Sequence, residues 1–175
     1  GAARTCYLMS DFIIRAAIPD DAAAIIAFWN PMIESGKYTA FDTPFTEEQE
    51  RTYIANQTVR DIFHVAERAS DGAVVGFQSM SPYPGLASMA HVGVIGTFVA
   101  PAFQRQGIAR QLLAETVAVA RQRGYEKIFT FVRADNPGAL AAYKSQGFRI
   151  VGTAQQQTKI NGSYVDEVII ERLLS

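Results

Sequence analysis

The sequence is short of cysteine and of long apolar runs, and each shortage excludes a class of protein. Cys6 is the only cysteine, so no disulfide can form within the chain, and a reducing cytoplasm is the expected compartment. No run of about 18 apolar residues occurs, so we expect no segment that crosses a membrane. Arg4 is not followed by a long apolar core, which argues against a secretory signal. Residues 1–11 are expected to form a loose lead-in.

An excess of charge of either sign is also missing. The chain has 16 Lys and Arg against 17 Asp and Glu, and this balance argues against a nucleic-acid binder, which is usually basic. His64, His91 and Cys6 do not have the spacing of metal ligands, so no metal site is expected. The glycine patterns of a P-loop and of a dinucleotide-binding strand–helix turn do not occur either, so neither of these phosphate sites is predicted.

What remains is a chain that suits one domain over residues 12–175, with 49% hydrophobic residues for its core. Patterns of apolar residues, caps and turn residues predict a βαα–βββ–αβ–αββ order, which is an α+β domain with a mixed, mostly antiparallel central sheet. The predicted strands cover residues 12–18, 63–68, 74–80, 91–99, Lys127–Arg133, 148–152 and 165–173. The predicted helices start after Asp20 or Asp21, at Thr46, at Gly107 and at Asn136.

One turn between a strand and an amphipathic helix stands out, residues 104–110, "QRQGIAR". A helix N-terminus offers unpaired N–H groups and a positive dipole end, which suits a phosphate. Gly107 lets the backbone approach an oxygen closely, Ala109 is the next smallest choice, and Arg105 and Arg110 add positive charge. The same residues fit a tight turn with solvated arginines equally well, so the turn alone leaves both interpretations open.

A second pattern follows about thirty residues later, Asn136-Pro-Gly-Ala139-x-x-x-Tyr143-x-x-x-Gly147-Phe148. Together, the two stretches resemble the two signatures of the GCN5-related N-acetyltransferase (GNAT) superfamily, the first being Q/R-x-x-G-x-G/A after a strand. The resemblance covers the chain from about residue 12 to its end. Residues 36–49, "GKYTAFDTPFTEEQ", are loosely similar to phosphinothricin-type and related amino-acid N-acyltransferases. The fold implied is a three-layer α/β/α arrangement around a splayed sheet.

The resemblance implies acetyl-coenzyme A as the acyl donor. Backbone amides of the turn would bind its pyrophosphate, and the residues implied are Gln104, Arg105, Gln106, Gly107, Ile108, Ala109 and Arg110. Free backbone groups of Phe98 and Val99 would pair with the pantetheine arm, in the manner of strand addition. Gly93 and Gly96 suit a bulged, splayed strand here.

Tyr143 would lie near the thioester sulfur and protonate the leaving thiolate. The alternative is a core tyrosine packed with Leu140 and Phe148, and the sequence leaves both open. Asn136 would bind the donor, cap its helix, or do both. In this family an acceptor-binding loop would contain Tyr38 and Phe41.

The general base is not predicted directly, because Val94 occupies the position where many relatives carry a glutamate. We therefore expect an ordered water, linked to His91, to take the proton of the amine. His91 would need a bulge at Gly93 to turn inward, since strand alternation points it away from the face of Val94. A carboxylate such as Asp42 or Glu34, on the irregular segment around residues 37–45 between the first two predicted helices, is the second candidate.

These patterns predict a cytoplasmic, acetyl-CoA-dependent N-acetyltransferase that acts on a primary amine. The expected acceptor is a small amine, an amino acid or an analogue, and a homodimer is favoured because dimers are common in the family. Two alternatives stay open at this point: acetylation of a protein N-terminus or lysine, and a non-enzymatic acyl-CoA sensor. Neither a nucleic acid nor a membrane is expected as a partner.

Overall fold

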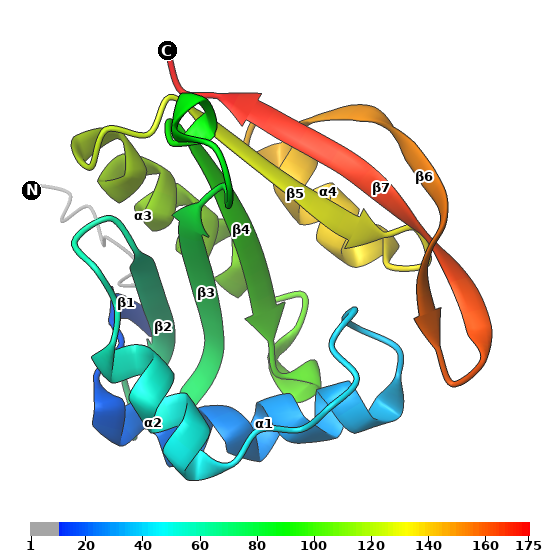
Figure 1. Cartoon of the computed structure of the whole chain (residues 1–175). Coiled ribbons are helices and arrows are strands. Elements are labelled where there is room, and N and C mark those ends of the chain that lie inside the picture. Colours follow the sequence, from blue (N-terminus) through cyan, green and yellow to red (C-terminus); the bar gives the residue numbers. More distant parts are fainter. Residues whose placement is uncertain (1–10) are drawn as a thin grey trace, which may run out of the picture.

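The computed structural model describes residues 11–175, which leaves Cys6 and almost all of the predicted lead-in outside. Across the described residues, seven strands form one sheet in the order β1-β2-β3-β4-β5-β7-β6, with four α-helices on its two faces (Figure 1). The strands are β1 (Phe12–Ala16), β2 (Ile62–Arg68), β3 (Val74–Pro82), β4 (Val92–Val99), β5 (Lys127–Arg133), β6 (Arg149–Ile160) and β7 (Ser163–Leu173). The helices are α1 (Ala22–Ser35), α2 (Glu47–Ala55), α3 (Ile108–Gln122) and α4 (Pro137–Ser145).

The predicted order of elements and the mixed, mostly antiparallel sheet are confirmed, with β4 and β5 as the parallel pair of the described sheet. The bounds of β5 are also as predicted, Lys127–Arg133. β1 ends at Ala16, two residues earlier than expected, because the chain then enters a short 3₁₀ helix at Pro19–Asp21. β4 begins at Val92, so His91 lies in the preceding turn and not in the strand.

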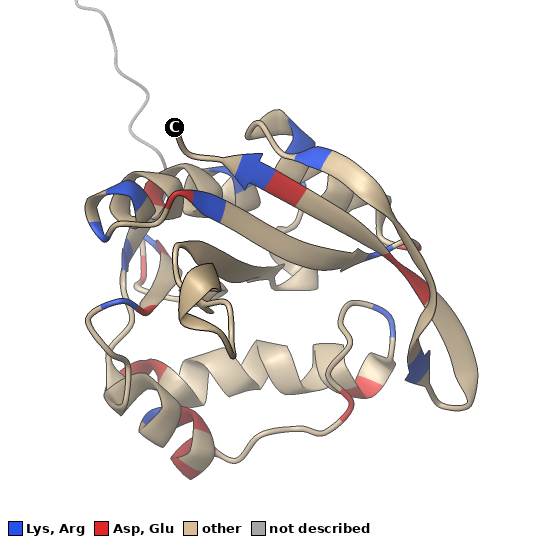
Figure 2. Cartoon of the chain, turned by 45° about the horizontal axis from the view of Figure 1, so that its top comes forward, with Lys and Arg blue, Asp and Glu red and all other residues tan. Residues whose placement is uncertain are grey.

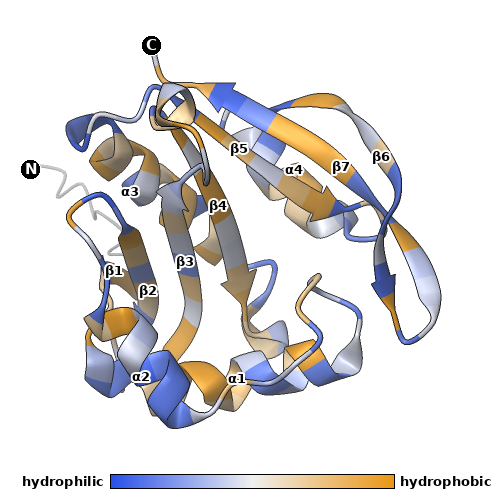
Figure 3. Ribbon diagram, viewed as in Figure 1, coloured by the Kyte–Doolittle hydropathy of each residue, from blue (hydrophilic) through white to orange (hydrophobic). Residues whose placement is uncertain are grey.

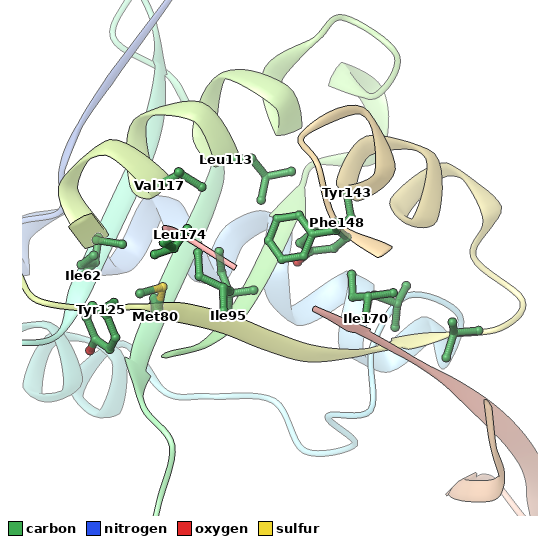
Figure 4. Packing of buried hydrophobic residues seen from close by; sticks show 14 residues of the cluster. Ile62, Met80, Ile95, Leu113, Val117, Tyr125, Tyr143, Phe148, Ile170 and Leu174 are labelled. Atoms are coloured by element: carbon green, nitrogen blue, oxygen red, sulfur yellow. The ribbon is translucent and has the colours of Figure 1, made fainter. Parts of the chain in front are cut away.

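Two apolar layers hold the helices to the sheet, and they confirm the three-layer arrangement. On the side of α3 and α4, the core includes Ile95, Leu113 and Tyr143 (Figure 4). On the side of α1 and α2, Trp29 and Phe77 belong to a second cluster, and Figure 3 shows hydrophobic stretches along α1 and β4. Among the described residues, no helix combines the length and apolar character that a membrane span requires.

The sheet separates between β4 and β5, as the resemblance implied. The two strands pair over only three residues, from Val92 opposite Lys127 to Val94 opposite Phe129. One step further along, the side chain of Thr130 bridges the gap, and its Oγ1 donates to the carbonyl of Ile95 at 2.6 Å. Beyond that contact β4 and β5 diverge, so the sheet has an open gap at the carboxyl ends of its two parallel strands (Figure 1).

The expected bulge at Gly93 is not found, and a packing constraint explains the glycine instead. The β3–β4 register runs without a shift from Gly76 opposite Val99 to Pro82 opposite Gly93. A Cβ on Gly93 would lie 2.5 Å from Cε of Met80, a fully buried core side chain. Gly93 therefore makes room for Met80, and the splay of the sheet comes from the short β4–β5 pairing.

Candidate active site

A cavity of about 740 Å³ lies at the gap between β4 and β5 and reaches across to α1 and α2. One part of its wall is aromatic and comprises Trp29, Tyr38, Phe41, Phe45, Tyr53, Phe63, Phe77 and Phe98. The other part is more polar and includes Thr97, Thr130, Arg133, Asn136, Tyr143, Thr158 and Glu167. The cavity thus joins an apolar pocket to the polar end of the two diverging strands.

The hydrogen bonds of β4 show which of its backbone groups face the gap. In an antiparallel pair, every second residue directs both its N–H and its C=O at the partner strand, and the residues in between direct theirs to the other side. The carbonyl of Val92 accepts from Tyr83, and the N–H of Ala100 donates to Val75, so even-numbered residues of β4 face β3. The backbone of Phe98 therefore belongs to the β3 ladder, and the structure corrects the expectation that it would pair with a donor. Its side chain lines the cavity instead.

The odd-numbered residues of β4 face the gap. The carbonyls of Ile95 and Val99 already accept from side chains, that of Val99 from Nε2 of Gln104 at 3.2 Å. The N–H of Val99 and the carbonyl of Thr97 remain on the open edge, whereas the N–H of Thr97 is directed at the hydroxyl of Tyr143. The structure thus keeps Val99 as a residue whose backbone faces the gap and adds Thr97. The sequence analysis missed Thr97 because the register of β4 is set by its pairing with β3, which is distant in sequence.

The turn at residues 104–110 forms an exposed start to α3. Gly107 caps the helix with φ +80°, and Arg105 also has a positive φ of 65°. A Cβ on Gly107 would meet no atom within 4 Å, and the first turn of α3 carries no acidic residue. Ile108 is 1% exposed and packs in the core, so only its backbone is available to a ligand. The turn therefore presents free N–H groups and cationic side chains without a competing carboxylate, which suits an anion.

α4 begins at the carboxyl end of β5, as α3 does beyond the end of β4 (Figure 1). Asn136 caps α4, because its Oδ1 accepts from the N–H of Ala139 at 3.2 Å. Asn136 also lines the cavity, so both roles considered from the sequence stay compatible with its position. Ligands of sheets with parallel strands commonly bind beyond the carboxyl ends of those strands.

Tyr143 combines the two interpretations that the sequence left open. Its ring is buried and contacts Phe148 at a centroid distance of 5.1 Å (Figure 4). Its hydroxyl reaches the cavity and donates to Oγ1 of Thr97 at 2.9 Å. Burial raises the pKa of Tyr143 to about 12, although hydrogen bonds with Thr97 act in the opposite direction. The phenol is therefore held in its protonated form, which is the form that can donate a proton.

A chain of buried hydrogen bonds fixes the direction of this contact. Oγ1 of Thr97 donates to Oε1 of Gln78 at 2.7 Å, and Nε2 of Gln78 donates to the carbonyl of Leu112 at 3.0 Å. Since Gln78 is fully buried and Thr97 has a single hydroxyl proton, the hydroxyl of Thr97 accepts from Tyr143 and cannot donate to it.

The loop between α1 and α2 is tied to β5 by Arg133, which is 6% exposed. Its Nη1 donates to the carbonyls of Gly36 and Thr39, at 2.7 and 3.2 Å. Its Nε and Nη2 form a two-pronged ion pair with Asp135, at 2.9 and 2.8 Å. The guanidinium is therefore engaged on most of its donors, and it positions one end of the loop.

The other end of the loop is held by Asn30 of α1. Its side-chain amide exchanges two hydrogen bonds with the backbone of Phe45, at 2.8 and 3.0 Å. Between these anchors, Tyr38 and Phe41 line the cavity, and the ring of Phe41 lies 5.7 Å from that of Trp29. The structure thus places both residues predicted for the acceptor loop in the cavity wall.

The three side chains considered as general bases do not reach the cavity. His91 is exposed at the amino end of β4, whereas the gap opens at the other end. With no bulge at Gly93, nothing in the strand turns His91 inward. Asp42 and Glu34 are also exposed and lie outside the wall.

Two other carboxylates line the cavity, and the sequence analysis missed both. Glu50 and Glu167 are 6% and 3% exposed, and burial raises the pKa of each. For Glu167, the hydroxyl of Thr158 and the charge of Arg133 counteract part of this effect. A signal for Glu50 was present, since it precedes Ile54 by four residues and so shares the inner face of α2.

Comparison with known proteins agrees with this geometry. Residues 30–148 match the model of the acetyltransferase (GNAT) family. The chain is 25% identical to "Putative phosphinothricin acetyltransferase YwnH" of Bacillus subtilis (strain 168), over 93% of this chain and 99% of that protein.

Two solved structures share the fold. A ribosomal-protein-alanine N-acetyltransferase from Brucella melitensis has a TM-score of 0.86 and 28% identity, covering 92% of this chain and 99% of that one. A phosphinothricin acetyltransferase from Sinorhizobium meliloti, solved in complex with AcCoA, has a TM-score of 0.87 and 20% identity, covering 94% and 89%. Because the family model covers more than half of the sequence and the fold agrees with it, this chain belongs to the acetyltransferase (GNAT) family.

Proposed function

We propose that this acetyltransferase moves an acetyl group from acetyl-CoA to a primary amine of a small acceptor: an amino acid, an amino-acid analogue or another small amine. The observation that carries the proposal is the single cavity that joins the open edge of β4 to the aromatic wall, with the hydroxyl of Tyr143 between them. The names of the relatives, which include phosphinothricin acetyltransferases, support a small acceptor.

The described residues fit the donor. The N–H groups at the start of α3, together with Arg105 and Arg110, would hold the pyrophosphate, and Gly107 leaves space there for a close approach. The carbonyl of Thr97 and the N–H of Val99, which remain on the open edge, would pair with the amide-containing arm. Acetyl-CoA would supply the activated acetyl group at this edge.

The residues around the gap then have separate tasks. A strand N–H on the open edge would polarise the acetyl carbonyl. The hydroxyl of Tyr143 would turn from Thr97 to protonate the leaving thiolate. An alkyl ammonium must lose a proton before its nitrogen attacks, and we assign this proton to a water in the cavity, because His91 does not lie there.

The alternative of a protein N-terminus or lysine is supported by the name of the Brucella structure. A peptide groove between the α1–α2 loop and the hairpin of β6 and β7 would favour it. That space is closed at one end, because a Cβ on Gly36 would lie 3.1 Å from Nδ2 of Asn161 and 3.2 Å from Cγ2 of Ile160. The contact favours a small acceptor over a peptide.

A panel of amines with acetyl-CoA, followed by release of free thiol, tests the proposal. The panel contains phosphinothricin, methionine sulfoximine, methionine sulfone, simple amines and short peptides with an N-terminal alanine. We expect thiol release with small amines and little with peptides. Release with peptides alone would favour the protein acetyltransferase, and binding of acetyl-CoA without release by any amine would identify a sensor.

A further inference from the structure

The charges of the cavity limit the acceptors that it can hold. Among the wall residues within 11–175, the charged ones are Glu50, Glu167 and Arg133. Arg133 is already engaged by Asp135 and by two loop carbonyls. The described wall therefore has no unengaged cation for a carboxylate or phosphinate, the groups that amino acids and phosphinothricin carry besides their amine.

Glu50 is the charged group of the wall that lacks a partner. It is 6% exposed, and its carboxylate makes no hydrogen bond or ion pair with any residue that the structure describes. Glu167, by contrast, accepts from Oγ1 of Thr158 at 2.7 Å and lies near Arg133. A buried carboxylate without a partner is unfavourable, and a ligand cation would remove that penalty.

The surroundings of Glu50 are aromatic. On α2, Tyr53 follows Glu50 by three residues and lies against Phe63, with ring centroids 5.8 Å apart. Phe77 stacks on Phe63 at 5.6 Å and contacts Trp29 at 5.1 Å, so the rings form a continuous apolar wall. Such a wall accepts an apolar or aromatic body and favours a cation over its ring faces.

We propose that the acceptor is a primary amine with an apolar, aromatic-sized body and no anionic group, and that Glu50 is the counter-ion of its ammonium. This proposal rests on the proposed function and narrows it to one class of acceptor. Figure 2 shows the acidic segments of α2, whose first turn carries Glu47, Glu48 and Glu50. Of the three, Glu50 is buried and lines the cavity, so we assign to its carboxylate the preference for a cationic acceptor.

Trp29 provides a test that does not depend on turnover. It is the only tryptophan of the chain and lies in the cavity wall, so its fluorescence reports occupancy without acetyl-CoA. The probes are 2-phenylethylamine, L-phenylalanine, which adds a carboxylate, 2-phenylethanol, which lacks the charge, and phosphinothricin. We expect the amine to bind more tightly than each of the others by about tenfold or more, as for one favourable charge contact. Equal or tighter binding of phenylalanine, phenylethanol or phosphinothricin would overturn the proposal.

Two variants assign the effect to Glu50. Glu50→Gln keeps the shape of the side chain and removes its charge, while Glu48→Gln makes the same change at an exposed position of the same helix. Glu50→Gln should weaken 2-phenylethylamine about tenfold and leave 2-phenylethanol unchanged, and Glu48→Gln should alter neither. Unchanged amine binding in folded Glu50→Gln would overturn the counter-ion role. If the variant does not fold, the comparison of amine and alcohol on the unaltered protein decides.

Thiol release separates this inference from the proposed function. Turnover of phosphinothricin or amino acids in preference to simple amines would leave the acetyltransferase reaction standing and overturn the amine class. A fluorescence preference for the amine without turnover of any acceptor would uphold the binding site and refute the proposed function.

Discussion

Replacing Tyr143 by Phe separates the two roles of this residue, because it removes one oxygen and leaves the ring. The contact with Phe148 remains, and Thr97 can still donate to Gln78. The main structural loss is the hydrogen bond from the hydroxyl to Oγ1 of Thr97 at 2.9 Å, and the backbone of Thr97 loses its weaker contact with the same hydroxyl. One such bond contributes about 1 kcal/mol to the free energy of unfolding. For a chain of this length, that corresponds to a fall in Tm of about 2–4 °C.

The catalytic loss should be much larger if Tyr143 protonates the leaving thiolate. Removal of a general acid lowers kcat by about 10²–10⁴, which is about 3–5 kcal/mol of activation free energy. The affinity for acetyl-CoA should change little. Since burial raises the pKa of Tyr143 to about 12, the hydroxyl stays protonated well above pH 10. The unaltered enzyme should therefore show no loss of rate near pH 10 from this group.

Thiol release at saturating acetyl-CoA and urea denaturation measure the two effects on the same preparation. Tyr164→Phe is the matched control, because Tyr164 is 58% exposed on β7 and outside the cavity. It should change neither rate nor stability. A Tyr143→Phe protein that loses about 1 kcal/mol of stability but keeps its full rate would show that the tyrosine only packs and that another group protonates the thiolate.

Gly107→Val should abolish acetyl-CoA binding in calorimetry while circular dichroism stays unchanged, because φ +80° disfavours valine and its side chain would enter the anion site. Gly124→Val, at φ +83° beyond the other end of α3, is the control for backbone strain, and equal affinity in both folded variants would refute the assignment. Burial lowers the pKa of His64 from 6.5, so that, as the pH falls, the histidine of the unfolded chain takes up its proton at a higher pH than that of the folded protein. The free energy of unfolding, measured by urea denaturation, should therefore fall as the pH drops below 6.5. His64→Gln should make this dependence on pH less steep. An equally steep dependence in both proteins would contradict the assignment to His64.

The fold was predictable where the signal is local. Asn161 and Gly162 predict a two-residue hairpin turn, and both have the positive φ values that it requires, 51° and 80°. The capping box at Thr46 was equally visible, and its side chain accepts from the N–H of Gln49. Elements defined by such neighbours in sequence appear in the predicted order.

The site was only partly predictable because its walls depend on direction and on distant partners. Asp42 lies close in sequence to the acceptor loop, yet its side chain is exposed, whereas Glu50 on the following helix faces the cavity. Proximity along the chain does not show which way a side chain points. The edge role of Thr97 likewise depends on the pairing of β4 with β3, which no local pattern encodes.

If the donor binds as proposed, the short pairing of β4 with β5 makes the stability of the molecule depend on its own substrate. Only three residue pairs and the side chain of Thr130 join β4 to β5, and the backbone groups of the odd-numbered β4 residues beyond them face a gap. A donor bound in that gap, as proposed above, would add hydrogen bonds across it to the apolar core that already joins the two halves. The free energy of unfolding then rises with its concentration, by about 2.7 kcal/mol at a hundred times Kd. A protein built in this way resists unfolding and proteolysis best when its donor is plentiful, so its lifetime would follow the supply of acetyl groups.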